Sequence, residues 1–162
     1  MEFTICPGCG VRLLKSDSLP EKKFNSSKEC WELFCQLSAL TPNYDEEFIH
    51  QMAIDTYEAQ HGGGDTKNIA VVFGLAGLYL SLENNYSGRQ VQKAHMVLGE
   101  KNKEWPKLEP PTFNWEYTVK DVLDSSLEKG LKEEIRKWAE VTWKGWGEQQ
   151  KTIEDICNYY LS

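Results

Sequence analysis

The chain has 162 residues, enough for one well-packed domain, because a domain of roughly 150 residues buries about two-thirds of its unfolded surface. Its net charge of −7 argues against a protein that mainly neutralises nucleic-acid phosphates, since such binding depends on Lys and Arg. No apolar run approaches the roughly 18 residues of a membrane span, and the N-terminus lacks a secretory signal pattern. We therefore expect residues 1–162 to form a single cytoplasmic domain that does not enter a membrane.

Residues 1–25 are predicted to form a knuckle followed by a polar loop, with no helix or strand period that lasts. The knuckle is Cys6-Pro-Gly-Cys9-Gly10. Pro and Gly between two cysteines allow both thiolates to turn towards one ion, and a tetrahedral ion needs two further nitrogen or sulfur ligands. In a reducing compartment such a pair is more often a metal knuckle or a redox pair than a structural disulfide.

Four helices are expected in the helical core, residues 26–102. The first is expected to be capped by Ser26 or Ser27, and the second to start at Asn43 or Tyr44, with acidic residues at 45–47 in its first turn. Asp65 is the predicted cap of the third helix and Ser87 that of the fourth. Their predicted ends are about Leu40, the glycine run 62–64, about Glu83 and about Asn102. The third helix is apolar nearly all round, which predicts a central position.

An extended arm is predicted over residues 103–117, because three prolines exclude regular helix. Its expected anchors are Trp105, Phe113 and Trp115. Residues 118–162 are predicted to hold the C-terminal helices: a short one capped by Thr118, then an apolar pattern that starts at Leu127. That pattern predicts one long helix, or two separated near Gly145 or Gly147. Its stripe includes Trp138 and Trp146, whereas Trp143 lies off it and is expected to meet the arm or solvent.

Cys30 and His61 are the best candidates for the two further metal ligands. Cys30 lies in the first turn of a predicted helix, where unpaired N–H groups stabilise a thiolate. Cys35 lies about 140° around the same helix axis, so it is poorly placed to share the ion. Like Cys157, it is expected to be a small buried hydrophobe. His61 lies beside the glycine run, where the chain is free to fold back on a metal.

Asp55, Tyr57 and Gln60 form with His61 the densest polar group of the second predicted helix. In a catalytic interpretation His61 is a base and Tyr57 an acid. In the structural interpretation, which the sequence favours, Asp55 and Gln60 tie neighbouring loops to the bundle and Tyr57 lies in the core. His50 lies about 16 Å from His61 on the same helix, which prevents the two from sharing an ion.

Several motifs in this order resemble a family of uncharacterised bacterial proteins, a domain of unknown function. They are Cys6-Pro-Gly-Cys9-Gly10, Cys30-Trp31, Asp55-x-Tyr57-x-x-Gln60-His61-Gly62, Leu108-Glu109-Pro110-Pro111, Thr118-Val119-x-Asp121-Val122, and Trp138-Ala139 with Trp143 and Trp146. The resemblance implies that Cys6, Cys9, Cys30 and His61 belong to one site. The chain departs from the family pattern where Gly74 and Gln149-Gln150 replace expected histidines. If those histidines serve catalysis in relatives, this chain lacks them.

We therefore predict an all-α fold: a bundle of about five to seven helices with an N-terminal zinc-knuckle-like loop and a proline-rich extended arm. The leading function is a zinc-stabilised binding or interaction protein with a structural zinc on Cys6, Cys9, Cys30 and His61. The first alternative is a metal-dependent enzyme with His50, His61 and His95 around a divalent ion. The second alternative is an acidic protein that masks a basic partner. A protein partner fits these functions better than nucleic acid does.

Overall fold

Seven α-helices make up most of the part of the chain that the computed structural model describes, residues 1–42 and 48–162. They are α1 (Lys28–Leu40), α2 (Ile49–Gln60), α3 (Asn68–Glu83), α4 (Gly88–Lys101), α5 (Val119–Lys129), α6 (Leu131–Gly145) and α7 (Gln150–Leu161). A 3₁₀-helix, η2 (Gly147–Gln149), connects α6 to α7. The predicted all-α bundle is confirmed. None of the helices in the described ranges has both the length and the hydropathy of a membrane span.

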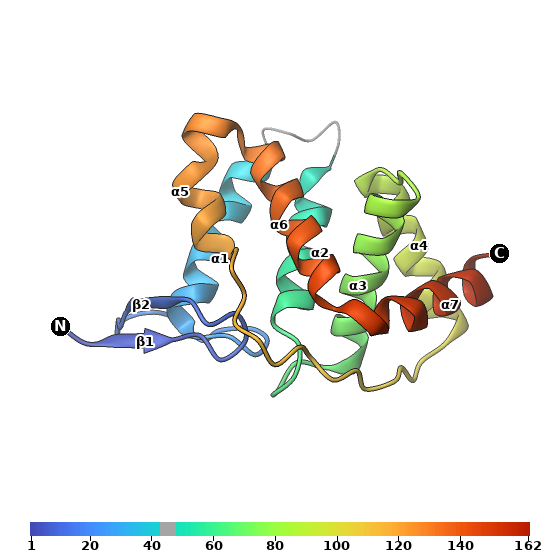
Figure 1. Cartoon of the computed structure of the whole chain (residues 1–162), viewed down its shortest axis with the longest axis horizontal. Coiled ribbons are helices and arrows are strands. Elements are labelled where there is room, and N and C mark those ends of the chain that lie inside the picture. The colour runs from blue at the N-terminus through green and yellow to red at the C-terminus, as the bar shows by residue number, and fades with distance from the viewer. Residues whose placement is uncertain (43–47) are drawn as a thin grey trace.

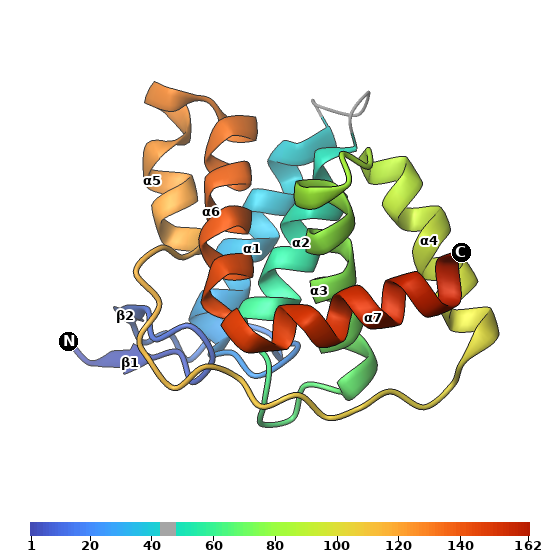
Figure 2. The same cartoon turned by 45° about the vertical axis from the view of Figure 1, so that its right-hand side comes forward.

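Helix α2 lies between two groups of helices (Figures 1 and 2). Helices α1, α5 and α6 lie on one side of it, and α3 and α4 on the other, while α7 runs across one end of the bundle. Helix α3 is buried over most of its surface, as its apolar sequence predicts. Gly74 brings it close to α2, because a Cβ there would lie 2.7 Å from the Asp55 carbonyl oxygen.

The N-terminal residues form a β-hairpin that the sequence did not indicate. Strand β1 (Phe3–Ile5) pairs antiparallel with β2 (Arg12–Leu14). The prediction that residues 1–25 contain no strand is therefore wrong. Each strand has three residues, too few for an alternating pattern to show, and the turn between the strands fixes their register.

Three of the four predicted helix starts with a capping side chain are confirmed: Ser27 caps α1, Ser87 caps α4 and Thr118 caps α5. Asp65 is not the cap of α3. That helix starts at Asn68 after Lys67, and the Asp65 carboxylate instead pairs with Lys22, 2.6 Å away. The predicted start of the second helix at residues 43–47 lies outside the described residues. Within them, α2 begins at Ile49.

The C-terminal helices α6 and α7 are separated near Gly145 and Gly147, so the second of the two predicted arrangements, two helices rather than one long helix, is the one observed. Leu127 does not lie on their buried stripe. Gly130, with φ of 92°, ends α5 after Lys129, and Leu127 is 98% exposed. Trp138 and Trp146 are buried as predicted.

Residues 102–118 contain no helix or strand, which confirms the predicted arm; it runs along the end of the bundle from α4 to α5 (Figure 2). Trp105 and Trp115 are buried, but Phe113 is 53% exposed, so its predicted anchoring role is wrong. Trp143 is only 6% exposed, so it does not face solvent. It is buried against Tyr79 on α3, and its indole N–H donates to Glu83, 3.1 Å away.

Candidate metal centre

Four potential metal ligands meet at one end of α2, and we call them the Cys3His cluster. Cys6 and Cys9 come from the turn of the hairpin, Cys30 from the first turn of α1, and His61 from the C-terminal end of α2. Their ligand atoms all lie within 4.8 Å of one another, and each residue is at most 1% exposed. The four residues that the sequence singled out are therefore brought together, and such a group can hold a metal ion.

Two distances within the cluster agree with those around a tetrahedral ion. The sulfurs of Cys9 and Cys30 are 3.8 Å apart, and the Cys30 sulfur is 3.5 Å from His61 Nε2. Tetrahedral zinc, with Zn–S of about 2.3 Å and Zn–N of about 2.0 Å, holds two sulfurs about 3.8 Å apart and a sulfur and a nitrogen about 3.5 Å apart. The three sulfurs and one nitrogen also have the chemistry of a structural zinc site.

The hairpin turn is shaped to aim both of its cysteines inward. The Cys6 N–H donates to Val11 O and the Gly10 N–H to Cys6 O, each at 2.9 Å, and Gly10 has a φ of 81°. Gly8 packs directly against the cluster. A Cβ there would lie 2.3 Å from the Asn25 oxygen and 2.6 Å from the His61 ring. The turn therefore needs a glycine at position 8 to approach His61 closely.

The His61 ring is fixed in the orientation that a metal ligand requires. Its Nδ1–H donates to Tyr57 O, 2.7 Å away, which leaves the lone pair of Nε2 directed at Cys30. The ring also stacks on Tyr57 with centroids 3.8 Å apart. The backbone turns away immediately afterwards through Gly63 and Gly64, which both have positive φ.

Cys30 receives support from its own helix and from α2. Its N–H donates to the Ser27 hydroxyl, 3.1 Å away, in the helix cap. The Tyr57 hydroxyl donates to the Cys30 sulfur, 3.3 Å away. Burial, and then the neighbouring Cys30, raise the pKa of Tyr57, so that the phenol keeps its proton and remains a donor.

The three thiols compete for protons in this buried space. Hydrogen bonds from Cys30 and Cys9 lower the pKa of Cys6, whereas bonds to Cys30 and Cys6, together with burial, raise the pKa of Cys9. All three can ionise together only if a cation compensates their charges. A divalent ion bound by the cluster would supply that compensation.

Comparison with known proteins identifies the family but adds no activity. A family model described as "Family of unknown function (DUF5946)" matches residues 4–147. The chain belongs to this family. The DUF5946 match covers the whole Cys3His cluster and confirms the resemblance to a family of unknown function. No curated protein and no solved structure matches the chain significantly.

Tyr57 and Gln60 lie where the structural interpretation of the sequence expected them. Tyr57 is fully buried. Gln60 holds the arm, because its side-chain amide donates to Tyr117 O, 2.8 Å away, and its oxygen accepts from the Trp138 indole, 3.0 Å away. Neither side chain faces a surface pocket among those described, which gives no support to the catalytic interpretation.

Asp55 does not tie a loop to the bundle, so that prediction is wrong. Its carboxylate lies between α2 and α3, where Gly77 leaves room for it, and accepts from Gln51 of its own helix, 3.0 Å away. The other carboxylate oxygen is buried with no hydrogen-bond partner among the described residues. Burial, and then the nearby Glu58, raise the pKa of Asp55 well above its usual range.

His50 and His95 lie outside the cluster. His50 Nδ1 is 3.2 Å from the Thr41 hydroxyl, and His95 Nε2–H donates to Phe73 O, 2.8 Å away. The Cys3His cluster is the one group of three or more close metal ligands found in residues 1–42 and 48–162. The predicted three-histidine site is therefore not formed.

The remaining cysteines divide between surface and core. Cys35 is exposed, so its predicted burial is wrong, whereas Cys157 is buried as predicted.

The sequence analysis missed Asn25 and Thr66, which fasten the loop after the hairpin to the end of α2. The Asn25 N–H donates to the Thr66 hydroxyl (2.7 Å), which in turn donates to His61 O (2.6 Å). No local pattern connects residues so far apart in the chain.

Proposed function

We propose that the protein is a zinc-stabilised helical binding or interaction protein in which Cys6, Cys9, Cys30 and His61 hold one structural zinc ion. The observation that carries the proposal is the convergence of three sulfurs and one imidazole nitrogen within 4.8 Å of one another, with the Cys9–Cys30 and Cys30–His61 distances those around a tetrahedral ion. Catalytic zinc sites commonly keep one position open to water or substrate. Four protein donors, each at most 1% exposed, favour a closed structural site instead.

A zinc ion here would join the hairpin, α1 and the end of α2. The hairpin itself has only three residues in each strand. Short two-stranded hairpins are marginally stable alone. Metal binding would therefore contribute folding free energy mainly at this end of the molecule. The rest of the bundle would be stabilised by its apolar core.

Metal analysis of protein purified without chelator tests the proposal. We expect one zinc ion per chain, and we expect the double variant Cys6→Ser and Cys9→Ser to lose it. Cys35→Ser is the matched control, because Cys35 is an exposed cysteine outside the cluster. Absence of zinc from the wild-type protein, or its retention by the double variant, would contradict the proposal.

Cobalt substitution tests the ligand set separately from the amount of metal. Co²⁺ in a tetrahedral site with thiolate ligands should give visible absorption and a sulfur-to-metal charge-transfer band. We expect His61→Ala to change both bands, because it removes the nitrogen ligand. Identical spectra for the wild type and His61→Ala would remove His61 from the ligand set.

The predicted cytoplasmic location and the masking of a basic partner remain predictions.

A further inference from the structure

The β-hairpin presents its more apolar face to solvent. Phe3, Ile5 and Leu14 lie on one face of the two strands and are 47%, 65% and 50% exposed. Thr4 and Leu13, at the alternate positions, lie on the other face and are half-buried. A sheet with one solvated face normally has its polar side chains there. A group of exposed apolar side chains is typical of a binding surface, and we call these three residues the hairpin face.

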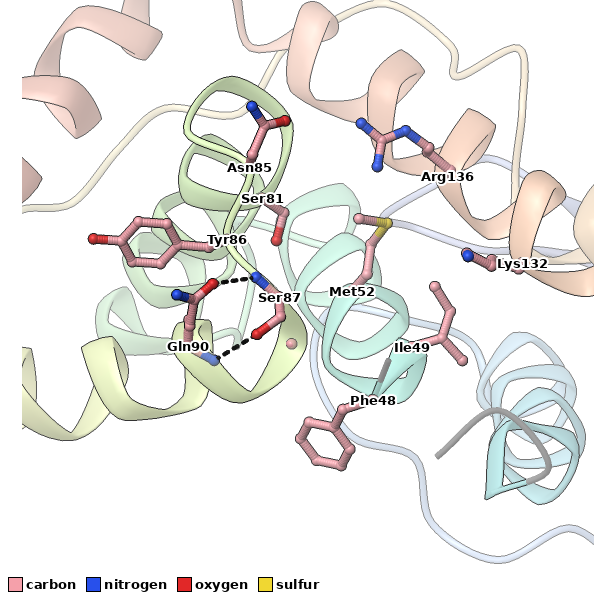
Figure 3. Close-up of a pocket in the computed structure, with 11 residues that line it drawn as sticks. Phe48, Ile49, Met52, Ser81, Asn85, Tyr86, Ser87, Gln90, Lys132 and Arg136 are labelled. Atoms are coloured by element: carbon pink, nitrogen blue, oxygen red, sulfur yellow. Dashed lines mark hydrogen bonds between the residues drawn. The ribbon is translucent and has the colours of Figure 1, made fainter. Parts of the chain in front are cut away.

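Other large apolar side chains at the surface are isolated or mixed with polar ones. Among the described residues, helices α1, α3, α4, α5 and α7 each have one that is exposed. In a pocket of about 290 Å³, Met52 is accompanied by Ser81, Ser87 and Gln90, and the last two bond to each other in the capping box of α4 (Figure 3). Within the described part of the chain, the hairpin is therefore the element that exposes several such side chains together.

The outer edge of β1 has backbone groups that are free to pair with a further strand. Figures 1 and 2 show β2 beside α1 and β1 as the outer strand. The N–H of Lys15 donates to Glu2 O, 2.9 Å away, in the ladder between the strands. Because bonded residues alternate in an antiparallel pair, Phe3 and Ile5 direct their N–H and C=O groups away from β2. These groups have no partner among the described residues, and such an edge is a template for pairing.

Arg12 adds a positive charge to the same face of the hairpin. Its guanidinium carbon lies 3.8 Å from the centroid of the Phe3 ring, so the charge is held over β1. Within the described residues Arg12 forms no ion pair, whereas the hairpin charges of Glu2 and Lys15 lie 3.8 Å from each other. A carboxylate on a strand added to β1 would therefore find a cation within reach.

We propose that the hairpin binds a short extended segment of a partner protein, which pairs with β1 as a third strand. The backbone of the segment would bond to Phe3 and Ile5, and its apolar side chains, at alternate positions, would lie beside theirs. An acidic residue of the segment would pair with Arg12. The inference rests on the proposed function, because Cys6 and Cys9 lie in the hairpin turn and the zinc ion would hold the hairpin to the bundle.

The size of the hairpin face favours a short segment over a second copy of this chain. Three half-exposed side chains offer far less than the roughly 800 Å² that each partner buries in a stable protein–protein interface. A strand added at an edge gains backbone hydrogen bonds as well, so it needs less apolar area.

Fluorescence anisotropy with a labelled peptide tests the proposal. The probe is EVTVTVE, blocked at both ends, in which valines alternate with threonines between two glutamates. We expect it to bind the zinc-loaded full chain. Replacing its central valine by proline should weaken binding about tenfold or more, since proline cannot donate a hydrogen bond. Replacing both glutamates by lysine should also weaken binding about tenfold, because Arg12 would then face a like charge.

Variants of the chain separate the apolar contact from the charge. Ile5→Thr keeps a residue that favours strands but removes apolar surface, and it should weaken binding about tenfold. Leu127→Thr, which changes an exposed leucine on α5, is the matched control and should leave binding unchanged. Arg12→Gln should abolish the preference for the glutamate peptide over the lysine peptide. Zinc content, measured for each variant, should stay at one ion per chain.

An independent measurement uses the wild type alone: the amide signals of Phe3 and Ile5 should shift when EVTVTVE is added. Zinc-loaded protein that does not bind the peptide, equal binding of all three peptides, or equal losses in Ile5→Thr and Leu127→Thr would overturn the docking surface and leave the zinc site intact. Peptide binding by protein that holds no zinc would contradict the proposed function instead. A dimer in sedimentation equilibrium that Ile5→Thr abolishes would make a second copy the occupant and overturn the proposal.

Discussion

Among the polar side chains that helix α2 buries are His61, at its end, and Asp55, fewer than two turns earlier. Both ring nitrogens of His61 have partners, and three cysteines from two other segments gather around it. Asp55 bonds to Gln51 of its own helix and keeps one oxygen unpaired beside Gly77. His61 and Asp55 are therefore both buried, but only around His61 are several potential metal ligands directed at one point.

The comparison shows how to separate a site from a buried polar residue. A site is indicated by the convergence of side chains from segments far apart in sequence, here the hairpin, α1 and α2. A buried carboxylate with one oxygen that lacks a hydrogen-bond partner is a cost to stability, even though the other oxygen of Asp55 bonds to Gln51 and lies 4.0 Å from His95 Nε2. Substitutions in the two regions should accordingly have opposite signs.

The largest expected effect is that of Cys30→Ser. In the proposed closed zinc site, loss of a ligand should release the metal and lower the free energy of unfolding by about 4 kcal/mol or more. Cys35→Ser, five residues away on the exposed side of α1, should change it by less than about 0.5 kcal/mol. Guanidinium unfolding followed by tryptophan fluorescence measures both. Equal stability of the two variants would remove the distinction between the cluster and an ordinary cysteine.

Gly8→Ala should have the next largest effect. The added methyl group would meet the Asn25 carbonyl oxygen and the His61 ring at 2.3 and 2.6 Å, which should cost about 2–3 kcal/mol. Gly99→Ala is the control, because its nearest neighbour is 3.9 Å away and it lies in the interior of α4. Alanine there should stabilise the protein by about 0.5–1 kcal/mol. Similar thermal unfolding of both variants would contradict the tight packing of Gly8.

Tyr57→Phe should affect metal binding more than folding. It removes only the hydroxyl that donates to Cys30, so zinc affinity should fall about tenfold while stability of the zinc-loaded protein falls by about 1 kcal/mol. Competition with a chromophoric chelator measures the affinity. Tyr79→Phe, which changes a hydroxyl outside the cluster, should leave it unchanged. An unaltered affinity in Tyr57→Phe would show that the bond to Cys30 does not tune the site.

Asp55→Asn is expected to have the smallest effect, with the opposite sign. Because burial raises the pKa of Asp55 in the folded protein, the folded state keeps a proton that the unfolded chain releases. Wild-type stability should therefore be fully present below the ordinary carboxyl pKa and fall as pH rises. Asp55→Asn lacks this fall and should be more stable than wild type by about 1 kcal/mol at neutral pH.

Urea unfolding between pH 4 and 8 measures this difference. Burial also raises the pKa of Glu58 to about 8, which lowers stability over the same range. Glu58 is present in both proteins, so the difference between the two curves reports Asp55 together with its interaction with Glu58. Parallel curves for Asp55→Asn and the wild type would show that Asp55 is not an unfavourable buried charge.

Local signals predicted most of the fold and the four residues of the cluster. Serine and threonine caps, the glycine run after His61 and the prolines of the arm act within a few residues of the boundary that they set. Cys30 could be selected over Cys35 because one lies in the first helical turn and the other does not. These arguments need only helix geometry and the chemistry of the side chains.

The errors concern contacts between distant segments. Trp143 lies off the main stripe of its helix, yet α3 covers it and Glu83 accepts its N–H. Asp55 faces α3 only because two glycines bring that helix close. Gly130 ends α5, so Leu127 lies on a different helix from the apolar stripe that it was predicted to begin, and it is exposed. In each case the partner is set by packing that the local sequence does not record.

All four residues of the cluster lie in the first 61 residues of the chain, and this position has a consequence for biosynthesis. About a hundred residues, Gly62–Ser162, follow His61 in the sequence, and their synthesis takes roughly 5–20 s at the usual rate of translation. The ligands are therefore synthesised well before α6 and α7, including Trp138 and Trp146. Nascent chains should acquire the ion early, and the later helices would then dock on an end of the molecule that is already fixed.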